Sequence, residues 1–169
     1  MGSGKSHISK ILSTRLNLKK IDLDKAISDK HNMPISQIFQ EKGEIYFRKE
    51  EKLILEDLLA SEEDLILSLG GGTPVYYNNI ETINNKSKSV FLRASVGTLA
   101  DRLMKQKDKR PLIAKLQESE LPEFIAKHLF ERNPFYNQAH IVIDTDGKTD
   151  LEIAEEIAKA VNHHPHQTI

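Results

Sequence analysis

The sequence predicts an α/β fold of three layers, in which helices cover both faces of a central parallel β-sheet. Two observations lead to this fold class. Short apolar runs typical of buried strands alternate along the chain with amphipathic helical patterns, the order that produces a parallel sheet covered on both sides. One of these runs, residues 64–69, ends directly in three glycines, as a buried strand does where it leads into a ligand-binding loop.

The composition predicts one domain and excludes several classes of function. The 169 residues, 38% of them hydrophobic, can bury a single sizeable core, and no repeat or linker divides residues 1–169. The net charge of −1 offers no basic surface to a nucleic acid, and the absence of cysteine excludes disulfides and thiolate metal sites. No apolar stretch approaches the roughly 18 residues of a membrane span. We therefore expect a cytoplasmic protein with a small anionic ligand, not a nucleic acid or a membrane.

The first residues carry the second half of a phosphate-binding loop. Gly2-Ser3-Gly4-Lys5-Ser6 matches the end of the pattern G-x-x-x-x-G-K-[ST], in which backbone N–H groups cradle a polyphosphate. In this pattern the lysine reaches the terminal phosphates and the hydroxyl of the last residue binds Mg²⁺. Lys5 and Ser6 are therefore candidates for these two roles.

The start of this motif is absent from the sequence. The first glycine would lie two residues before Met1, and the apolar strand that feeds such a loop would precede it. We therefore expect that the first strand of the sheet is missing from this sequence and that the native chain begins roughly ten residues earlier. Without that strand, two neighbouring strands would have unpaired backbone groups.

Helical and extended patterns alternate through the first half of the chain. Apolar spacing predicts helices over residues 5–17 and 44–60, and a helical stretch that stops near Pro34. Ser36 is a candidate N-cap for a brief helix that Gly43 ends. Extended segments are predicted to end at Asp24 and to span residues 64–69.

The second half of the chain supplies two more strands, four in all. They are predicted over residues 88–92 and 141–143. Ser95 is a candidate N-cap for a helix that runs through Met104, and Thr149 is one for the final helix. A further helix is predicted over residues 121–131.

Two segments show no regular pattern. Residues 105–117 are rich in charge and contain the pair Arg110-Pro111, which predicts a mobile surface segment. The histidine-bearing tail over residues 162–169 is predicted to be frayed, and a metal site there is the weaker interpretation.

Several side chains are candidates for a site at the carboxyl ends of the strands. Asp22 and Asp24 are two residues apart, so in an extended chain their carboxylates both point towards the site. The alternative interpretation is that one of them caps a helix and the other is a solvated acid. Arg48 and Arg132 would each, taken alone, be a solvated charge. The three glycines at positions 70–72 allow either a flexible loop or a close approach of the backbone to a ligand.

With these motifs in this order, residues 1–158 resemble the shikimate kinase family. That family belongs to the P-loop proteins of the nucleoside-monophosphate-kinase-like group. The resemblance implies ATP-dependent phosphorylation of the 3-hydroxyl of shikimate to 3-phosphoshikimate, a step towards chorismate and the aromatic amino acids. It also implies Mg²⁺ as the cofactor, ATP as the co-substrate, shikimate as the acceptor and a monomeric protein.

The resemblance assigns the nucleotide side of the site. Gly2, Ser3, Gly4, Lys5 and Ser6 match the phosphate loop, and His7 stands where the family usually has Thr or Ser near the α-phosphate. Arg110 matches the lid arginine that closes over the triphosphate and stabilises its charge. Residues 143–148 resemble the adenine loop without the arginine often found there, so Lys148 is only a weak candidate.

The resemblance also assigns the acceptor side. Asp24 matches the residue that binds the shikimate hydroxyls and accepts a proton, and Asp22 the residue that holds a water on Mg²⁺. Arg48 and Arg132 match the pair that grips the shikimate carboxylate. Gly70, Gly71 and Gly72 match the substrate loop, with Gly71 expected to make the most direct contact.

Two other functions stay open at this point. The first is a kinase for another small polyol acid such as gluconate, against which the arginine pair and Asp24 argue. The second is a nucleotide-binding protein without catalysis, which only the missing start of the motif favours.

Overall fold

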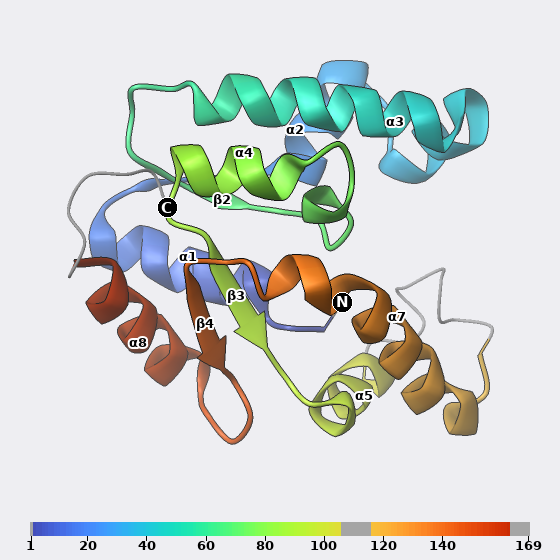
Figure 1. Cartoon of the computed structure of the whole chain (residues 1–169), viewed down its shortest axis with the longest axis vertical. Helices are drawn as coiled ribbons and strands as arrows, with labels where there is room; N and C mark the ends of the chain where they lie inside the picture. The colour runs from blue at the N-terminus through green and yellow to red at the C-terminus, as the bar shows by residue number, and fades with distance from the viewer. Residues whose placement is uncertain (1, 106–115, 163–169) are drawn as a thin grey trace.

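The computed structural model describes residues 2–105 and 116–162 (Figure 1). Most of the expected lid, including Arg110, and the tail from residue 163 lie outside this part. The elements in order are α1 (Lys5–Leu16), β1 (Lys19–Asp22), α2 (Leu23–His31), α3 (Ile35–Leu59), β2 (Leu65–Ser68), η1 (Thr73–Val75), α4 (Asn79–Lys86), β3 (Val90–Arg93), α5 (Val96–Met104), η3 (Glu118–Glu120), α7 (Leu121–Tyr136), β4 (Ile141–Asp144) and α8 (Asp150–Asn162). Among these residues, no helix has the length and apolar character that a membrane span needs.

The strands form two parallel pairs. β1 pairs with β2, with Asp22 opposite Ser68, and β3 pairs with β4, with Arg93 opposite Asp144. The predicted parallel pairing is confirmed, and the described strands form two separate pairs, in agreement with the expectation that two neighbouring strands lack a partner between them. Between β2 and β3 lies a cavity of about 220 Å³, so the backbone edges of these two strands do not reach each other.

Helices cover both faces of the strands, as predicted. On β2, Ile66 packs against the apolar cluster of α1 and α8, whereas the next residue, Leu67, packs against the cluster of α2, α3 and α4. This change of face follows from the two-residue period of a strand. Figure 1 shows α3 and α4 on one side of β2, with α1 and α8 on the other. A third cluster joins α5 to α7.

The two helices that were predicted on either side of Gly43 are present as two segments of α3. α3 continues through Gly43, where the backbone leaves helical geometry at φ 80 and ψ 169 and kinks the helix. Glycine adopts this conformation at low cost, so the predicted break is present as a kink. Ser36 is wrong as the N-cap, because Pro34 occupies that position and α3 begins at Ile35.

α7 is longer than predicted. The sequence placed its end at residue 131, yet the helix continues through Pro134 to Tyr136. A proline inside a helix removes one backbone hydrogen bond, so tertiary packing must stabilise the continuation. Contacts of this end of the helix come from Tyr136, whose ring packs on Phe91 of β3 and whose hydroxyl donates to the carbonyl of Gly71. As a result Arg132 and Tyr136 lie one turn apart on one helix.

The N-caps predicted for α5 and α8 are confirmed. Ser95 Oγ accepts a hydrogen bond from the N–H of Thr98 at 3.2 Å and caps α5. Thr149 Oγ1 accepts one from the N–H of Glu152 at 3.3 Å, and the Glu152 carboxylate accepts from the N–H of Thr149 at 2.7 Å. This reciprocal pair is a capping box at the start of α8. Helix α4 had not been predicted from the sequence.

Candidate active site

The phosphate loop leads directly into α1. Gly2 and Gly4 have φ values of 70 and 86, which L-residues with a side chain rarely adopt. Gly4 is the N-cap, and its carbonyl accepts hydrogen bonds from the N–H groups of His7 and Ile8. Lys5 is the first residue of the helix, so the positive end of the helix dipole lies at this loop. The arrangement is suited to an anion, as the motif predicted.

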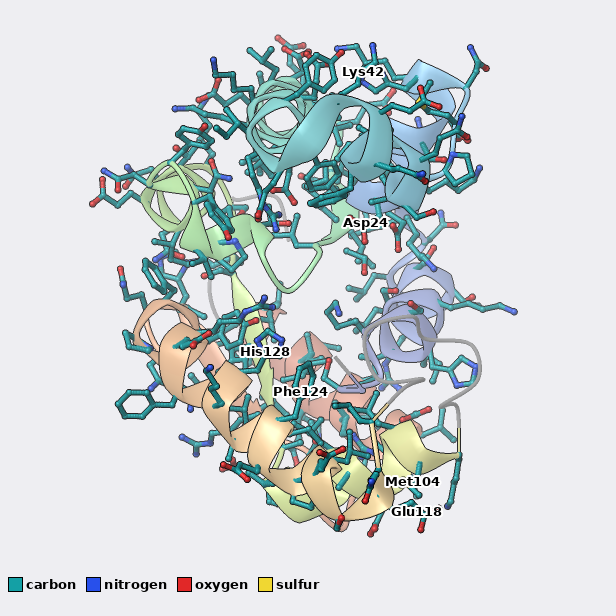
Figure 2. All side chains as sticks on the ribbon, turned by 90° about the vertical axis from the view of Figure 1, so that its right-hand side faces the viewer. Asp24, Lys42, Met104, Glu118, Phe124 and His128 are labelled. Carbon is teal, nitrogen blue, oxygen red and sulfur yellow. The ribbon has the colours of Figure 1, made fainter. Side chains whose placement is uncertain are left out.

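The structure corrects the geometry of the aspartate pair. β1 ends at Asp22, and Asp24 lies in the first turn of α2 instead of on the strand. Asp22 Oδ1 accepts a hydrogen bond from the N–H of Lys25 at 3.2 Å and so caps α2. The two carboxylates are therefore not aligned by strand periodicity. Asp22 is an N-cap, and its role at Mg²⁺ stays a prediction. Figure 2 shows Asp24 on the side of α2 that faces α1.

Asp24 lies in a field of mixed charge. Its side chain reaches the surface, but the surrounding protein desolvates it, and this burial is the main cause that raises the pKa of the carboxyl above its usual value. The charges of Asp22 and Glu51 raise this pKa further, whereas those of Lys5 and Arg48 lower it. A carboxylate with a raised pKa accepts a proton more readily, which suits a general base.

The three consecutive glycines each pack against a different predicted acceptor-side residue. A methyl group on Gly70 would lie 3.1 Å from Asp24 Oδ1, one on Gly71 would lie 3.2 Å from Arg132 Nη1, and one on Gly72 would lie 2.7 Å from Arg48 Nη2. None of these glycines has a positive φ. Glycine is therefore required here because side chains approach the backbone closely, and not because the backbone conformation demands it. The loop thus gathers Asp24, Arg48 and Arg132, which come from three different helices.

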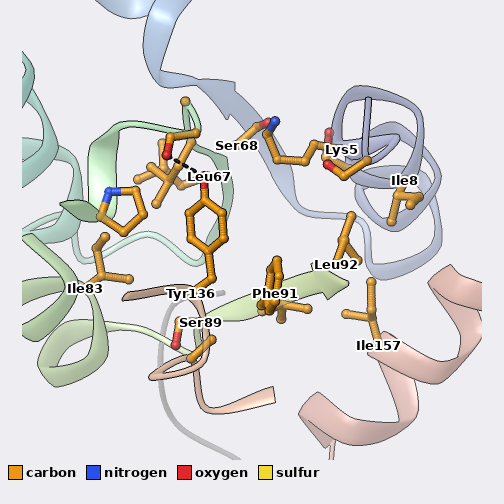
Figure 3. Close-up of a pocket in the computed structure, with 18 of the residues that line it drawn as sticks. Lys5, Ile8, Leu67, Ser68, Ile83, Ser89, Phe91, Leu92, Tyr136 and Ile157 are labelled. Atoms are coloured by element: carbon orange, nitrogen blue, oxygen red, sulfur yellow. Dashed lines mark hydrogen bonds between the residues drawn. The ribbon is translucent and has the colours of Figure 1, made fainter. Parts of the chain in front are cut away.

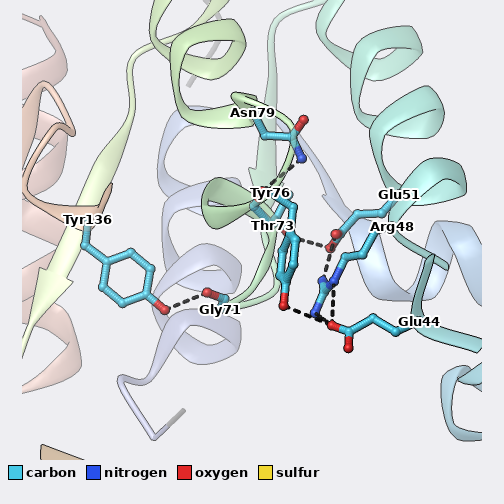
Figure 4. A network of polar contacts seen from close by, with 8 residues as sticks. All are labelled: Glu44, Arg48, Glu51, Gly71, Thr73, Tyr76, Asn79 and Tyr136. Carbon is cyan, nitrogen blue, oxygen red and sulfur yellow. Dashed lines mark hydrogen bonds and ion pairs between the residues drawn. The ribbon is translucent and has the colours of Figure 1, made fainter. Parts of the chain in front are cut away.

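Arg48 is held by acidic and aromatic neighbours (Figure 4). Its Nη1 donates to Glu51 Oε2 at 2.8 Å, and its Nε lies 3.3 Å from Glu44 Oε1. The guanidinium carbon lies 4.2 Å from the centre of the Tyr76 ring, whose hydroxyl donates to Glu44 Oε1 at 3.0 Å. Burial lowers the pKa of Arg48, but the bond to Glu51 offsets this effect and the net pKa is raised. Arg48 therefore presents a fixed positive charge to the site.

Sequence reasoning missed several residues of this network. Glu51 is only 1% exposed, and it also accepts a hydrogen bond from Thr73 Oγ1 at 2.7 Å. The spacing of Arg48 and Glu51 on a helix, i and i+3, is a signal that could have found this pair. No local signal points to Thr73 or to Tyr136, because both act across long separations in the chain.

His7 and Lys148 are engaged by residues of α8. His7 Nδ1 lies 3.3 Å from Asp150 Oδ2, and Lys148 Nζ lies 2.7 Å from Glu156 Oε2. Asp150 also lies beside the phosphate loop, since a methyl group on Gly4 would be 3.8 Å from its Oδ1. The structure thus places His7 beside the loop, whereas it ties Lys148 to the final helix.

An apolar cavity lies between β2 and β3, beside the phosphate loop and the glycine loop (Figure 3). Its walls are mostly aliphatic, but Lys5, Ser68, Gly70, Gly71 and Tyr136 also line it. The cavity interior carries few groups for chemistry, so the candidate active site is the polar end, where the phosphate loop approaches the glycine loop.

The described residues fit Mg²⁺ only as a partner of phosphate oxygens. Residues 2–105 and 116–162 contain no cluster of three or more histidine or acidic side chains that could hold a metal alone. Mg²⁺ commonly takes one or two protein ligands together with phosphate oxygens and water. The Ser6 hydroxyl and the Asp22 carboxylate are compatible with this kind of site.

Comparison with known proteins identifies the family of the chain. Residues 1–162 match the family model described as shikimate kinase. The chain is 44% identical to the shikimate kinase of Flavobacterium psychrophilum, over 94% of this chain and 93% of that protein. It is 46% identical to that of Flavobacterium johnsoniae, over 93% and 92%.

Solved structures show the same relationship. The crystal structure of shikimate kinase from Bacteroides thetaiotaomicron superposes with a TM-score of 0.85 at 32% identity, over 96% of this chain and 92% of that one. Shikimate kinase from Acinetobacter baumannii, solved in complex with shikimate, gives 0.84 at 28% identity, over 99% and 91%. The chain therefore belongs to the shikimate kinase family, with the P-loop kinase fold that its motifs predicted.

Proposed function

We propose that this protein transfers the γ-phosphoryl group of ATP to the 3-hydroxyl of shikimate and releases ADP and 3-phosphoshikimate. The observation that carries this proposal is the loop at residues 70–72, whose glycines pack against Asp24, Arg132 and Arg48 in turn. This one loop brings two guanidinium groups and a carboxylate together. Two guanidinium groups suit the carboxylate of an acceptor, and the carboxylate suits its hydroxyls.

The reaction needs one bond to form and one to break. The acceptor oxygen attacks the γ-phosphorus, the bond from that phosphorus to the β–γ bridging oxygen breaks, and ADP leaves with the electron pair. Asp24 takes the proton of the attacking hydroxyl, a role that its raised pKa supports. Because the transition state is loose, positioning and charge neutralisation supply most of the rate enhancement.

The phosphate side of the site would neutralise the charge of the transferred group. Lys5 would contact the β- and γ-phosphates, and Gly2, Ser3 and Gly4 would direct backbone N–H groups at them. Ser6 and Asp22 would hold Mg²⁺, which supplies positive charge to the phosphate oxygens. Arg110, outside the described residues, stays predicted as the lid arginine of the segment at residues 105–117. His7 and Lys148 stay predicted as nucleotide contacts, and the protein is proposed to be a cytoplasmic monomer.

The test is ADP release from MgATP in the presence of shikimate, with gluconate as the control acceptor. We expect turnover with shikimate, much weaker turnover with gluconate, and loss of turnover in Lys5→Met and Asp24→Asn. Faster turnover with gluconate than with shikimate would show that the acceptor is gluconate and not shikimate. Binding of ATP without turnover of either acceptor would show a nucleotide-binding protein and overturn the proposal.

A further inference from the structure

Tyr136 joins α7 to the glycine loop across the site. Its hydroxyl donates a hydrogen bond to the carbonyl oxygen of Gly71 at 2.6 Å, between residues 65 positions apart in the sequence (Figures 3 and 4). The bond lies within the normal length range for a hydroxyl donor and is partly buried, so solvent can take over part of its role when the hydroxyl is removed. The helix therefore holds one defined carbonyl of the loop.

Arg132 and Tyr136 reach the same residue of that loop. A methyl group on Gly71 would lie 3.1 Å from Tyr136 Oη and 3.2 Å from Arg132 Nη1. The two side chains are four residues apart on α7, so they project from the same face of the helix. The hydrogen bond of Tyr136 consequently sets the distance between Arg132 and the loop.

The hydrogen bond also sets the direction of a backbone donor. The peptide that joins Gly71 to Gly72 is planar and trans, so its C=O and N–H point in opposite directions. With the carbonyl held towards α7, the Gly72 N–H must point away from α7. Gly72 itself lies against the guanidinium of Arg48. One hydroxyl thus orients the peptide that lies between the two arginines.

Packing holds the Tyr136 ring independently of its hydroxyl. The ring lies 5.0 Å from the ring of Phe91 on β3, at an interplanar angle of 38°. Replacing Tyr136 by phenylalanine keeps this contact and removes only the hydrogen bond. The ring contact and the hydroxyl can therefore be tested separately.

We infer that Tyr136 is a positioning residue for the acceptor: its hydroxyl sets the Gly71–Gly72 peptide relative to Arg132 and Arg48, and so sets the affinity for the acceptor carboxylate. This inference rests on the proposed function. Tyr136 acts through the loop and stays outside the group of residues that touch the reacting atoms. Its removal should thus affect acceptor binding and leave nucleotide binding intact.

The experiment compares Tyr136→Phe with the unsubstituted protein. Tyr77→Phe is the matched control, because Tyr77 is 45% exposed and its ring lies beside Lys52, which has no proposed role in the site. In Tyr136→Phe we expect KM for shikimate to rise about five- to tenfold, the loss that one hydrogen bond produces. KM for MgATP should change by less than about twofold. The melting temperature without ligand should stay close to that of the unsubstituted protein, while the additional stabilisation by saturating shikimate should fall.

Three outcomes would contradict the inference. An unchanged KM and an unchanged dissociation constant for shikimate in Tyr136→Phe would overturn it while the proposed function stands. Equal losses in both KM values together with a lower melting temperature would show a purely structural role and also overturn it. If the unsubstituted protein neither turns over nor binds shikimate, the proposed function fails and the inference fails with it.

Discussion

Arg48 Nη1 lies 2.8 Å from Glu51 Oε2, and Glu51 is almost completely buried at 1% exposure. A buried carboxylate needs a partner for each oxygen, and Thr73 Oγ1 supplies the second at 2.7 Å. The acid therefore ties the arginine of α3 to the residue that follows the glycine loop. Glu51 and Thr73 therefore hold the guanidinium of Arg48 in place.

Arg48→Lys should weaken acceptor binding although the charge is kept. An ammonium group cannot hold Glu51 and present a planar pair of N–H groups to an acceptor carboxylate at the same time. We expect KM for shikimate to rise about ten- to a hundredfold, or roughly 1.4 to 2.8 kcal/mol, with KM for MgATP little changed. Steady-state kinetics with each substrate varied would measure this. Arg15→Lys, at an exposed pair with Glu155, is the control, and an equal effect there would contradict the explanation.

Glu44→Gln should improve acceptor binding. Glu44 Oε1 lies 3.3 Å from Arg48 Nε and 3.4 Å from Nη2, and its side chain is 53% exposed. Its negative charge thus competes with an acceptor carboxylate for the same guanidinium. Exposed pairs of this kind contribute about 0.2–1 kcal/mol, so KM for shikimate should fall by up to about fivefold. A rise in KM, measured in the same assay, would show instead that Glu44 helps to hold the acceptor.

Gly72→Ala should harm acceptor binding without a change of backbone conformation. The added methyl group would lie 2.7 Å from Arg48 Nη2 and 2.8 Å from Nη1, so the guanidinium must move, and Glu51 opposes that movement. We expect KM for shikimate to rise at least about tenfold, with a loss of stability of roughly 1–3 kcal/mol from overpacking. Kinetics and chemical denaturation would measure both.

Gly97→Ala is the matched control for that substitution. Gly97 lies inside α5, and the nearest atom to its added methyl group would be Ser95 Oγ at 4.0 Å. Alanine in a helix should raise stability by about 0.4–1 kcal/mol and leave KM unchanged. If both variants altered KM alike, close packing at Gly72 would not be the cause.

Asp24→Asn should reduce kcat by about 10²–10⁴-fold, the usual contribution of a general base. In the unsubstituted protein, kcat/KM should fall as pH decreases through the pKa of Asp24, which burial raises above its ordinary value of 3.8. This acid limb should therefore lie above pH 3.8 and should be absent from the residual activity of the variant. A limb that persists in Asp24→Asn would assign it to another group.

The raised pKa of Asp24 also predicts how folding stability depends on pH. The direction is opposite to that of activity: activity falls as pH decreases, whereas stability falls as pH rises. Because the folded state holds the Asp24 proton more tightly than the unfolded state, folding stability falls as pH rises from 3.8 through the raised pKa. At neutral pH this cost is complete, so Asp24→Asn should be at least as stable as the unsubstituted protein. The advantage should disappear at acid pH, which melting temperatures measured across pH would show. A variant that is less stable at neutral pH would contradict this reasoning.

The sequence by itself determined the features that depend on neighbouring residues. The start of α1 at Lys5 and the caps by Ser95 and Thr149 follow from local patterns and were confirmed, and the parallel pairing that the alternation of strands and helices predicted was confirmed as well. Each cap is a bond between a side chain and a backbone group three residues away, so a short stretch of sequence contains all of its information. The family could also be predicted from the sequence, because each of its motifs is a short stretch and the motifs occur in the order typical of that family.

Only the tertiary structure decided which distant groups meet. Glu51 had no predicted role, and its partner Thr73 lies 22 residues away; Tyr136 bonds to Gly71 across 65 residues. The predicted geometry of the aspartate pair was wrong because α2 begins directly after Asp22, so Asp24 lies on a helix and not on the strand. Such contacts depend on how all the helices pack around the strands, which no local pattern encodes.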